Sequence, residues 1–239
     1  LLKVLPEETS GLACIFVDGR DGTHKVVVSQ GANKKIKAEW VPDSAISAGN
    51  ILLVQGEIKI EETEELCVRA KRNGALTVMN LAPVVNLSDR ILKNLDYLVV
   101  NEHEADLLGQ QKGMDTEDKL LFAVNMYDKY GVSTIVTLGP MGAVCCYKGE
   151  IVNVSALKIV AVDTIGAGDA FMGYFCAALD QKKPITEALR NAAIAGSLAC
   201  TKIGAQTALP APEEVSCYKG EIYVSAVTAE SQVGRSMRL

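Results

Sequence analysis

Apolar runs alternate with longer amphipathic segments over most of the chain. Residues 51–54 are apolar without interruption, which is typical of a strand buried on both faces of a parallel sheet. Residues 117–130 instead repeat apolar positions three or four apart, as an amphipathic helix does. These patterns predict strands at 51–55, 76–80, 97–100, 134–136 and 157–162, and helices at about 88–95, 117–130, 171–179 and 184–200. We therefore expect an α/β fold, a three-layer mostly parallel sheet with helices on both faces.

Two pairs of shorter segments predict β-hairpins. Residues 9–18 and 23–29 have strand character and flank a turn at 19–22. Residues 144–147 and 150–154 flank Lys148-Gly149 in the same way. Taken alone, the first pair is a plain surface hairpin.

The composition excludes several classes of protein. No apolar run is long enough to span a membrane, and a net charge of −5 without a large Lys/Arg cluster argues against a nucleic-acid partner. The 239 residues, 49% apolar and 22% charged, suit a soluble α/β protein with a large core. Seven cysteines without metal-ligand spacing indicate reduced thiols and a cytoplasmic location.

The candidate chemistry is concentrated between the predicted strand at 157–162 and the predicted helix at 171–179. A turn of small residues, Gly166-Ala167-Gly168, opens that helix and leaves backbone N–H groups free to bind an anion such as phosphate. Asp169 follows at once and repels the anion that those groups attract. Its presence makes sense if it removes a proton from a nucleophile that attacks a phosphate. An ordinary strand-to-helix turn stays open, because short glycine motifs are weak evidence.

The segment 163–171, DTIGAGDAF, resembles the signature of the ribokinase (PfkB) family of carbohydrate kinases, and the resemblance extends from about Thr9 to about Pro212. Phe171 occupies the third glycine position of a dinucleotide-binding fingerprint, which argues against that alternative. The resemblance implies a ribokinase-like fold in which the first hairpin is a lid over the sugar and a homodimer contact. It divides the chain into a β-lid segment at 1–33, an N-terminally incomplete α/β domain at 34–214 and an atypical tail at 215–239.

The resemblance also implies a reaction, the transfer of the γ-phosphate of ATP to a sugar hydroxyl. Asp169 would be the catalytic base and would contact the sugar, and the amides of Gly166, Ala167 and Gly168 would form the anion hole. Glu57, after the strand at 51–55, would hold a sugar hydroxyl. Nucleotide binding would fall to Asn101, Thr137, Gly139, Gly142 and Gly168.

The same resemblance implies binding sites for two cations, Mg²⁺ and K⁺. Asn101 and Glu104 match an Asn-x-x-Glu motif, whose carboxylate would hold Mg²⁺ through water. Taken alone, this pair is a helix capping box. The resemblance implies that K⁺ is held, mostly through backbone carbonyls, by Asp163, Ile165, Ala199, Lys202 and Gly204. Ala208 stands where the family has a serine ligand.

Ribose, converted to ribose 5-phosphate, is the favoured substrate. Gly31-Ala32-Asn33, Glu57 and Gly204-Ala205-Gln206 support it within the family pattern. Fructose, adenosine or another nucleoside is the alternative within the family. A truncated, non-catalytic nucleotide-binding protein is the alternative outside it.

Two features depart from the family pattern. The family's N-terminal third, with its Asn-x-Asp sugar contact and Gly-Gly-Lys-Gly-Ala-Asn loop, has no match, which predicts fewer sheet strands and poor or absent ribose phosphorylation. The hexapeptide CYKGEI at 146–151 also recurs at 217–222, with Val-Ser-Ala after both copies. We interpret the second copy as part of a duplicated or misjoined tail that replaces the family's last helix; a second copy of the hairpin is the alternative.

Overall fold

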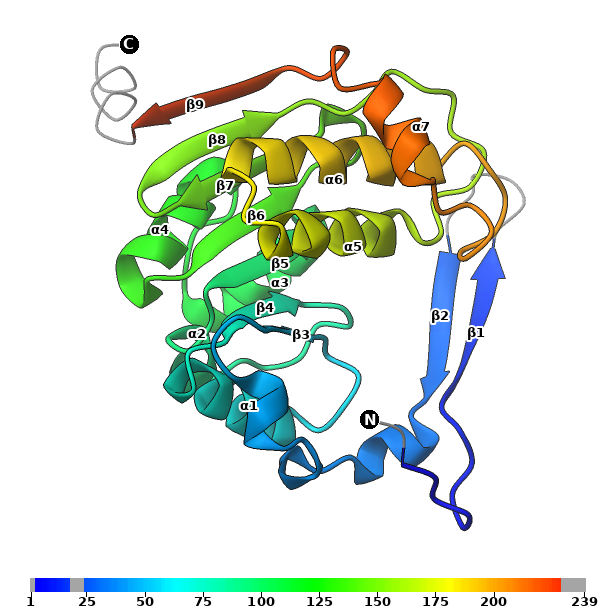
Figure 1. Ribbon diagram of the computed structural model, residues 1–239, viewed down its shortest axis with the longest axis vertical. Coiled ribbons are helices and arrows are strands. Elements are labelled where there is room, and N and C mark those ends of the chain that lie inside the picture. Colours follow the sequence, from blue (N-terminus) through cyan, green and yellow to red (C-terminus); the bar gives the residue numbers. More distant parts are fainter. Residues whose placement is uncertain (1–2, 18–23, 229–239) are drawn as a thin grey trace.

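The computed structural model describes residues 3–17 and 24–228 and is built around a seven-stranded mixed sheet (Figure 1). Strands β3 to β6 pair in parallel, and β6 to β9 pair antiparallel. In spatial order the strands are β3 (Ile51–Val54), β4 (Leu76–Asn80), β5 (Tyr97–Asn101), β6 (Ser133–Thr137), β7 (Ala143–Tyr147), β8 (Glu150–Val154) and β9 (Val224–Thr228). The expected α/β class is confirmed, with a sheet that is parallel in one half and antiparallel in the other.

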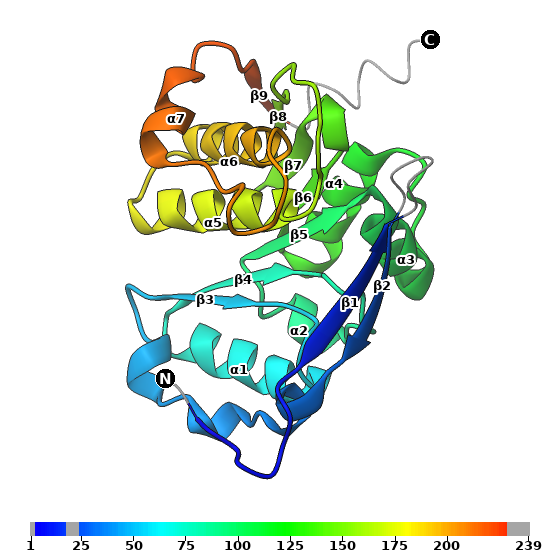
Figure 2. The same cartoon turned by 90° about the vertical axis from the view of Figure 1, so that its right-hand side faces the viewer.

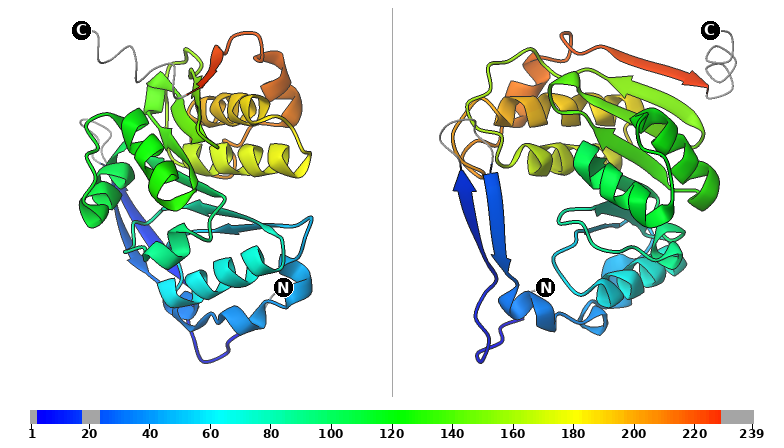
Figure 3. Two further views of the ribbon diagram at one scale, coloured as in Figure 1. Left: turned by 90° about the vertical axis from the view of Figure 1, so that its left-hand side faces the viewer. Right: turned by 180° about the vertical axis from the view of Figure 1, so that it is seen from behind.

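Helices cover both faces of this sheet (Figures 2 and 3). One face carries α1 (Ile60–Arg72), α2 (Asp89–Leu92), α3 (Glu102–Lys112) and α4 (Lys119–Tyr130). The other carries α5 (Ala167–Asp180) and α6 (Ile185–Ala199), with the short α7 (Pro212–Cys217) against α6. No helix of the described residues is long and apolar enough to cross a membrane.

Alternate side chains of the strands enter two separate cores, one on each face. Cys145 lies in the core under α5 and α6 and Cys146 in the core under α2, α3 and α4, and both are fully buried. Successive side chains of a strand point to opposite faces, which explains this division of adjacent residues. Burial raises the pKa of both thiols, so neither is poised to react at neutral pH. All seven cysteines are free.

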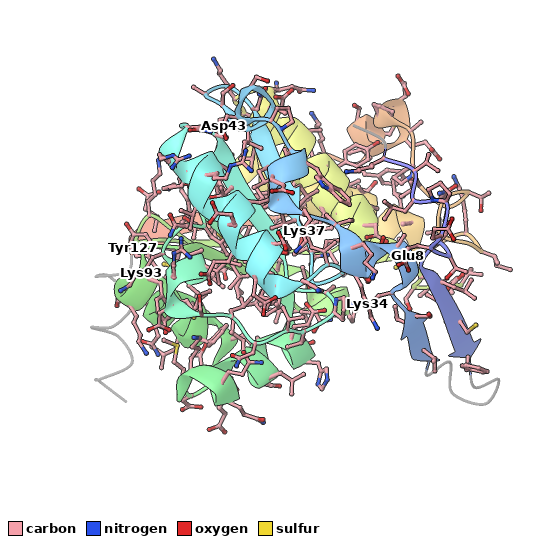
Figure 4. All side chains as sticks on the ribbon, turned by 90° about the horizontal axis from the view of Figure 1, so that it is seen from below. Glu8, Lys34, Lys37, Asp43, Lys93 and Tyr127 are labelled. Carbon is pink, nitrogen blue, oxygen red and sulfur yellow. The ribbon has the colours of Figure 1, made fainter. Side chains whose placement is uncertain are left out.

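A polar clasp ties the segment before the sheet to α1. This segment contains the 3₁₀ turns η1 (Gly31–Lys35), η2 (Ala38–Trp40) and η3 (Asp43–Ile46). Glu62 accepts hydrogen bonds from the Lys37 ammonium at 2.6 Å and the Ala38 N–H at 2.9 Å. Arg69 donates to the Asp43 carboxylate at 2.6 Å, and Figure 4 shows Lys37 and Asp43 beside α1. These hydrogen bonds therefore hold the segment that connects the hairpin to the edge strand β3 against α1.

The first hairpin stands apart from the main sheet, on the side where α5 begins (Figures 1 and 2). It consists of β1 (Leu12–Val17) and β2 (His24–Ser29), paired antiparallel from Leu12 opposite Ser29 to Val17 opposite His24. The predicted turn at 19–22 lies outside the described residues. Leu12, Ile15, Phe16, Val27 and Val28 are all substantially exposed, and neighbours such as 15 and 16 point to opposite faces. Both faces of the hairpin are therefore apolar.

The prediction of a strand at 157–162 is wrong. The segment pairs with none of the strands in residues 3–17 and 24–228, because β9 already occupies the sheet position beside β8. It runs instead along α6, where the Leu157 N–H donates to the Ser197 hydroxyl and the Val162 N–H to the Cys200 carbonyl. Val160 and Val162 are 86% and 58% exposed, so their strand-like pattern does not reflect burial.

The two copies of the hexapeptide adopt different structures. The first joins β7 to β8 through Lys148 and Gly149, both at positive φ (50° and 82°), as a type I′ turn requires. The second begins at the end of α7 and continues as a turn in which Gly220 is not left-handed. The alternative prediction, that the second hexapeptide forms another copy of the hairpin, is therefore wrong. The difference lies upstream: Pro212 opens α7, and the Glu214 carboxylate accepts the Ala211 N–H at 2.8 Å.

Gly149→Ala should lower the free energy of unfolding by about 1–2 kcal/mol, because alanine is strained at positive φ. Gly220→Ala should change it by less than about 1 kcal/mol and in the stabilising direction. The two glycines have identical neighbours on both sides, so each variant controls for the other. Urea denaturation followed by circular dichroism measures both, and equal effects would contradict the assigned turn conformations.

Candidate active site

A cavity of about 530 Å³ opens at the edge of the sheet where β6 ends and α5 begins. Its walls come from four stretches far apart in the sequence: the turn after β6, the segment after β8, the start of α5 and the second half of α6. The carboxyl ends of parallel strands are where open α/β sheets bind ligands. Its lining includes Thr137, Gly139, Gly142, Ala167 and Gly168, which the sequence assigned to the nucleotide and the anion hole, and Ala193, Gly196 and Ser197 of α6.

The turn after β6 closes one side of the cavity and depends on glycine. It forms the 3₁₀ turn η4 (Gly139–Met141), and the Leu138 N–H donates to the Gly142 carbonyl at 2.8 Å. Gly142 has a φ of 101°, and a Cβ there would collide with the Val154 carbonyl oxygen. The turn therefore lies directly against the end of β8, a packing that only glycine permits.

The start of α5 presents free backbone donors. Gly166 is left-handed (φ 81°) and packs against the backbone of Ala205. Among the described residues, the N–H groups of Gly168 and Asp169 donate no hydrogen bond, whereas the Ala170 N–H donates to the Gly166 carbonyl at 2.9 Å. The positive end of the helix dipole coincides with these donors, so this turn has the chemistry to hold an anion.

Asp169 lies in the first turn of α5 and is exposed. It does not line the 530 Å³ cavity, although Gly168 beside it does. It lines instead a neighbouring hollow of about 470 Å³, together with Gly173 and Tyr174 of the same helix. The carboxylate therefore stands at the boundary between two hollows, next to the free N–H groups.

Asp163 joins the two halves of the expected K⁺ loop. One carboxylate oxygen accepts the Ile165 N–H and the other accepts the Gly204 N–H, both at 3.0 Å. Ala199 is buried at the end of α6, and the Lys202 ammonium pairs with the Glu214 carboxylate at 3.0 Å. Asp163, Ile165 and Gly204 are thus brought together, while the Lys202 side chain extends toward α7.

Asn101 and Glu104 form a reciprocal capping box at the start of α3. The Glu104 N–H donates to the Asn101 side chain at 2.8 Å, and the Asn101 N–H donates to the Glu104 carboxylate at 2.7 Å. Burial raises the pKa of Glu104. Asn101 is opposite Thr137 in the sheet register, but neither Asn101 nor Glu104 lines the cavity. Within the described ranges, no three His, Cys, Asp or Glu residues form a cluster that could hold a metal.

Glu57 lies just beyond the carboxyl end of β3 and is half-buried. Its backbone carbonyl accepts the Gln30 side-chain amide at 3.3 Å, and Gln30 directly precedes η1. Gly56 packs so closely on the Pro83 carbonyl that no Cβ fits there. The structure thus brings Glu57 to Gly31-Ala32-Asn33, the two groups of residues that the sequence associated with the sugar.

Sequence reasoning missed part of the cavity wall. Leu157, Lys158, Ile159 and Ala161 line the cavity, yet the pattern of 157–162 predicted a sheet strand; Ala156 before them lines the cavity as well. Cys200 also lines the cavity, and nothing in its sequence context marks it. The sequence contains no turn signal between β8 and this segment. That absence alone does not distinguish a strand of the sheet from an extended segment outside it.

Comparisons with known proteins agree with this geometry. A family model described as pfkB family carbohydrate kinase matches residues 1–212. The ribokinase of Haemophilus influenzae is 32% identical over 216 residues, which cover 89% of this chain and 70% of that protein. The ribokinase of Schizosaccharomyces pombe is 34% identical over 222 residues, which cover 90% and 69%.

Solved structures show the same relationship. The ribokinase of Thermotoga maritima superposes with a TM-score of 0.80 at 33% identity, covering 88% of this chain and 70% of that chain. An Arabidopsis thaliana ribokinase complexed with ribose and ATP superposes with a TM-score of 0.78 at 29% identity, covering 89% and 70%. The chain therefore spans about 70% of the length of these relatives.

Gly142→Ala should lower the free energy of unfolding by about 2 kcal/mol or more, because the new methyl group collides with the β8 backbone and the φ is unfavourable. It should also weaken ligand binding in the cavity that this turn closes. Gly173→Ala is the control, since its Cβ meets nothing within 4 Å and it lies inside a helix, where alanine is preferred. Denaturant unfolding and ATP titration check both variants; a Gly142→Ala protein as stable as Gly173→Ala would contradict the close packing.

Proposed function

Since the chain belongs to the pfkB family of carbohydrate kinases, we propose that it transfers the γ-phosphate of ATP to a hydroxyl of ribose, giving ribose 5-phosphate, with low turnover because the family's Asn-x-Asp sugar contact has no match in the sequence. One observation carries this: the cavity places Thr137, Gly139 and Gly142 beside the free N–H groups that open α5, with Asp169 at the boundary. Ribose is favoured because the relatives from Haemophilus influenzae and Schizosaccharomyces pombe are ribokinases and the Arabidopsis thaliana structure holds ribose and ATP.

The nucleotide would lie in the 530 Å³ cavity, with its base against the small residues Ala193 and Gly196 of α6. Its phosphates would reach the N–H groups at the start of α5, which stabilise the charge on the transferring phosphoryl group without reorganising. Asp169 would remove the proton from the attacking hydroxyl. The nucleotide would thus approach this carboxylate from the cavity, which Gly168 beside it lines.

Two cations would assist. Mg²⁺ would neutralise charge on the phosphates, and the single carboxylate of Glu104 suits a contact through water. K⁺ would take oxygen ligands from the Asp163, Ile165, Ala199, Lys202 and Gly204 segments, a donor set of mainly backbone carbonyls that suits a monovalent cation. The Asp163 carboxylate already holds both segments together, so this chain supplies the frame of that site.

The sugar would be held by the Glu57 carboxylate and covered by the β1–β2 hairpin. Because both faces of this hairpin are apolar, one face would cover the sugar and the other would pack on a second copy of the chain in a homodimer. Seven free thiols are consistent with action in the cytoplasm. A non-catalytic nucleotide-binding protein is the alternative of a different class.

Asp169→Asn should reduce ribose-dependent ADP release by about a thousandfold, because loss of a general base costs 10²–10⁴, while ATP still binds. Asp180→Asn, an exposed acid at the other end of the same helix, should leave turnover unchanged. Coupled ADP release and calorimetric ATP titration measure the two effects. Near-normal turnover of Asp169→Asn would remove it as the base, and ATP binding without turnover in the wild-type chain would favour the non-catalytic alternative.

Turnover should rise severalfold when K⁺ replaces tetramethylammonium at constant ionic strength. The physical reason is that a bound cation would draw the carbonyls on either side of Asp163 together and so shape the turn that opens α5. Steady-state rates across a K⁺ titration provide the measurement. Equal rates in the two salts would count against the cation site.

A further inference from the structure

One wall of the nucleotide cavity is an extended segment that belongs to no sheet. Residues 156–159 and 161 supply this wall. Within the described part of the chain, no backbone hydrogen bond holds residues 158 to 161. The position of the wall therefore depends on the packing of Leu157 and Ile159 against the core under α5 and α6, and on the hydrogen bonds that attach the segment on either side.

Just before the segment, Ser155 and Tyr223 exchange two hydrogen bonds, and the two attachments within 157–162 are to Ser197 of α6 and to Cys200, which caps α6. At the start of the segment, the Leu157 N–H donates to the Ser197 hydroxyl at 3.1 Å. At its end, the Val162 N–H donates to the Cys200 carbonyl at 2.8 Å. Only the first attachment uses a side chain, so only Ser197 can be removed without changing the backbone of α6.

The Ser197 hydroxyl is itself oriented. It donates its proton to the Ala193 carbonyl, one turn earlier in α6, at 2.8 Å. A hydroxyl has one proton, so this one cannot also donate to a nucleotide. Leu157 is 6% exposed, and its N–H would lose the only partner it has among the described residues if the hydroxyl were removed. A buried donor left unpaired is costly, and the segment would shift to reach water.

We propose that Ser197 is a positioning residue for the nucleotide: its hydroxyl holds Leu157 against α6 and so sets the width of the space between the wall and α6. This inference rests on the proposed function, because the occupant of that space is ATP. Ser197 acts on binding rather than on chemistry, since it has no contact with Asp169 or with the turn 166–168 among the interactions of the described residues.

Ser197→Ala should raise the Kd and KM for ATP about tenfold, in line with the cost of an unpaired buried donor, and change kcat less than twofold. The Leu157 amide should exchange its hydrogen faster in the ligand-free protein. Ser197→Thr keeps the hydroxyl and should restore both the ATP affinity and the slow exchange, because threonine in a helix can also donate to the carbonyl one turn earlier.

Ser88→Ala is the matched control. The Ser88 hydroxyl also accepts a backbone N–H from a buried residue, Ile91, at 3.1 Å, but at the start of α2, on the opposite face of the sheet. It should lower thermal stability as Ser197→Ala does and leave the ATP affinity unchanged. A rise in Kd with both variants would show that general destabilisation, not the wall, controls binding.

Three measurements test the positioning role of Ser197: calorimetric ATP titration, steady-state kinetics with ribose, and hydrogen exchange at the Leu157 amide. If the Ser197→Ala variant binds ATP as tightly as the wild-type chain does, the positioning role alone is overturned. A wild-type chain that binds no ATP overturns the proposed function and the positioning role together. A raised KM, an unchanged kcat and faster Leu157 exchange, seen only with Ser197→Ala, support it.

Discussion

Helices α5 and α6 approach each other closely at Gly196, where an added Cβ would lie 3.2 Å from the Ala167 carbonyl oxygen. This approach determines the rest of the site. It places the start of α5, with its free N–H groups, beside the turn of α6 that carries Ser197 and Cys200. Those two residues then hold the segment 157–162. A bulkier residue at 196 would separate the helices and displace the anion-binding turn from its cavity.

Two aspartates six positions apart illustrate how environment assigns roles. Asp163 accepts two backbone N–H groups and joins segments 41 residues apart in sequence, so its carboxylate is part of the framework. Asp169 is exposed in the first turn of α5, beside the free N–H groups of that turn. An ionised carboxylate next to an anion-binding turn is unfavourable for phosphate binding alone. A role in proton removal gives a physical reason for that arrangement.

The hairpin and the main sheet serve different purposes. Buried side chains on both faces of the sheet fix the cavity rigidly, since two cores meet at the central strands β4 to β7. The described side chains of the hairpin belong to no such core, and Leu12, Phe16 and Val27 remain exposed in the single chain. Its attachment through Gln30 to the Glu57 backbone sets where it leaves the main body. An element of this kind gains stability only from what it covers, which suits a lid.

The sequence by itself determined the elements whose stability is local or whose burial pattern is unambiguous. The strands at 51–54, 76–80 and 97–101, the Lys148-Gly149 hairpin and the small-residue start of α5 follow from apolar runs and from the conformational freedom of glycine. The reciprocal bonds of Asn101 and Glu104 are equally local, and the sequence already contained the capping box as an alternative.

Only the tertiary structure decided the remaining features. The segment 157–162 has the pattern of a strand, but β9 occupies the place beside β8, and the hydrogen-bond partners of the segment lie on α6 some 40 residues away. The hexapeptide has one sequence and two structures, because Pro212 and Glu214 start a helix before one copy and a sheet precedes the other. In both cases the local preference is weak compared with the hydrogen bonds and packing offered by distant residues, and those partners cannot be identified until the chain has folded.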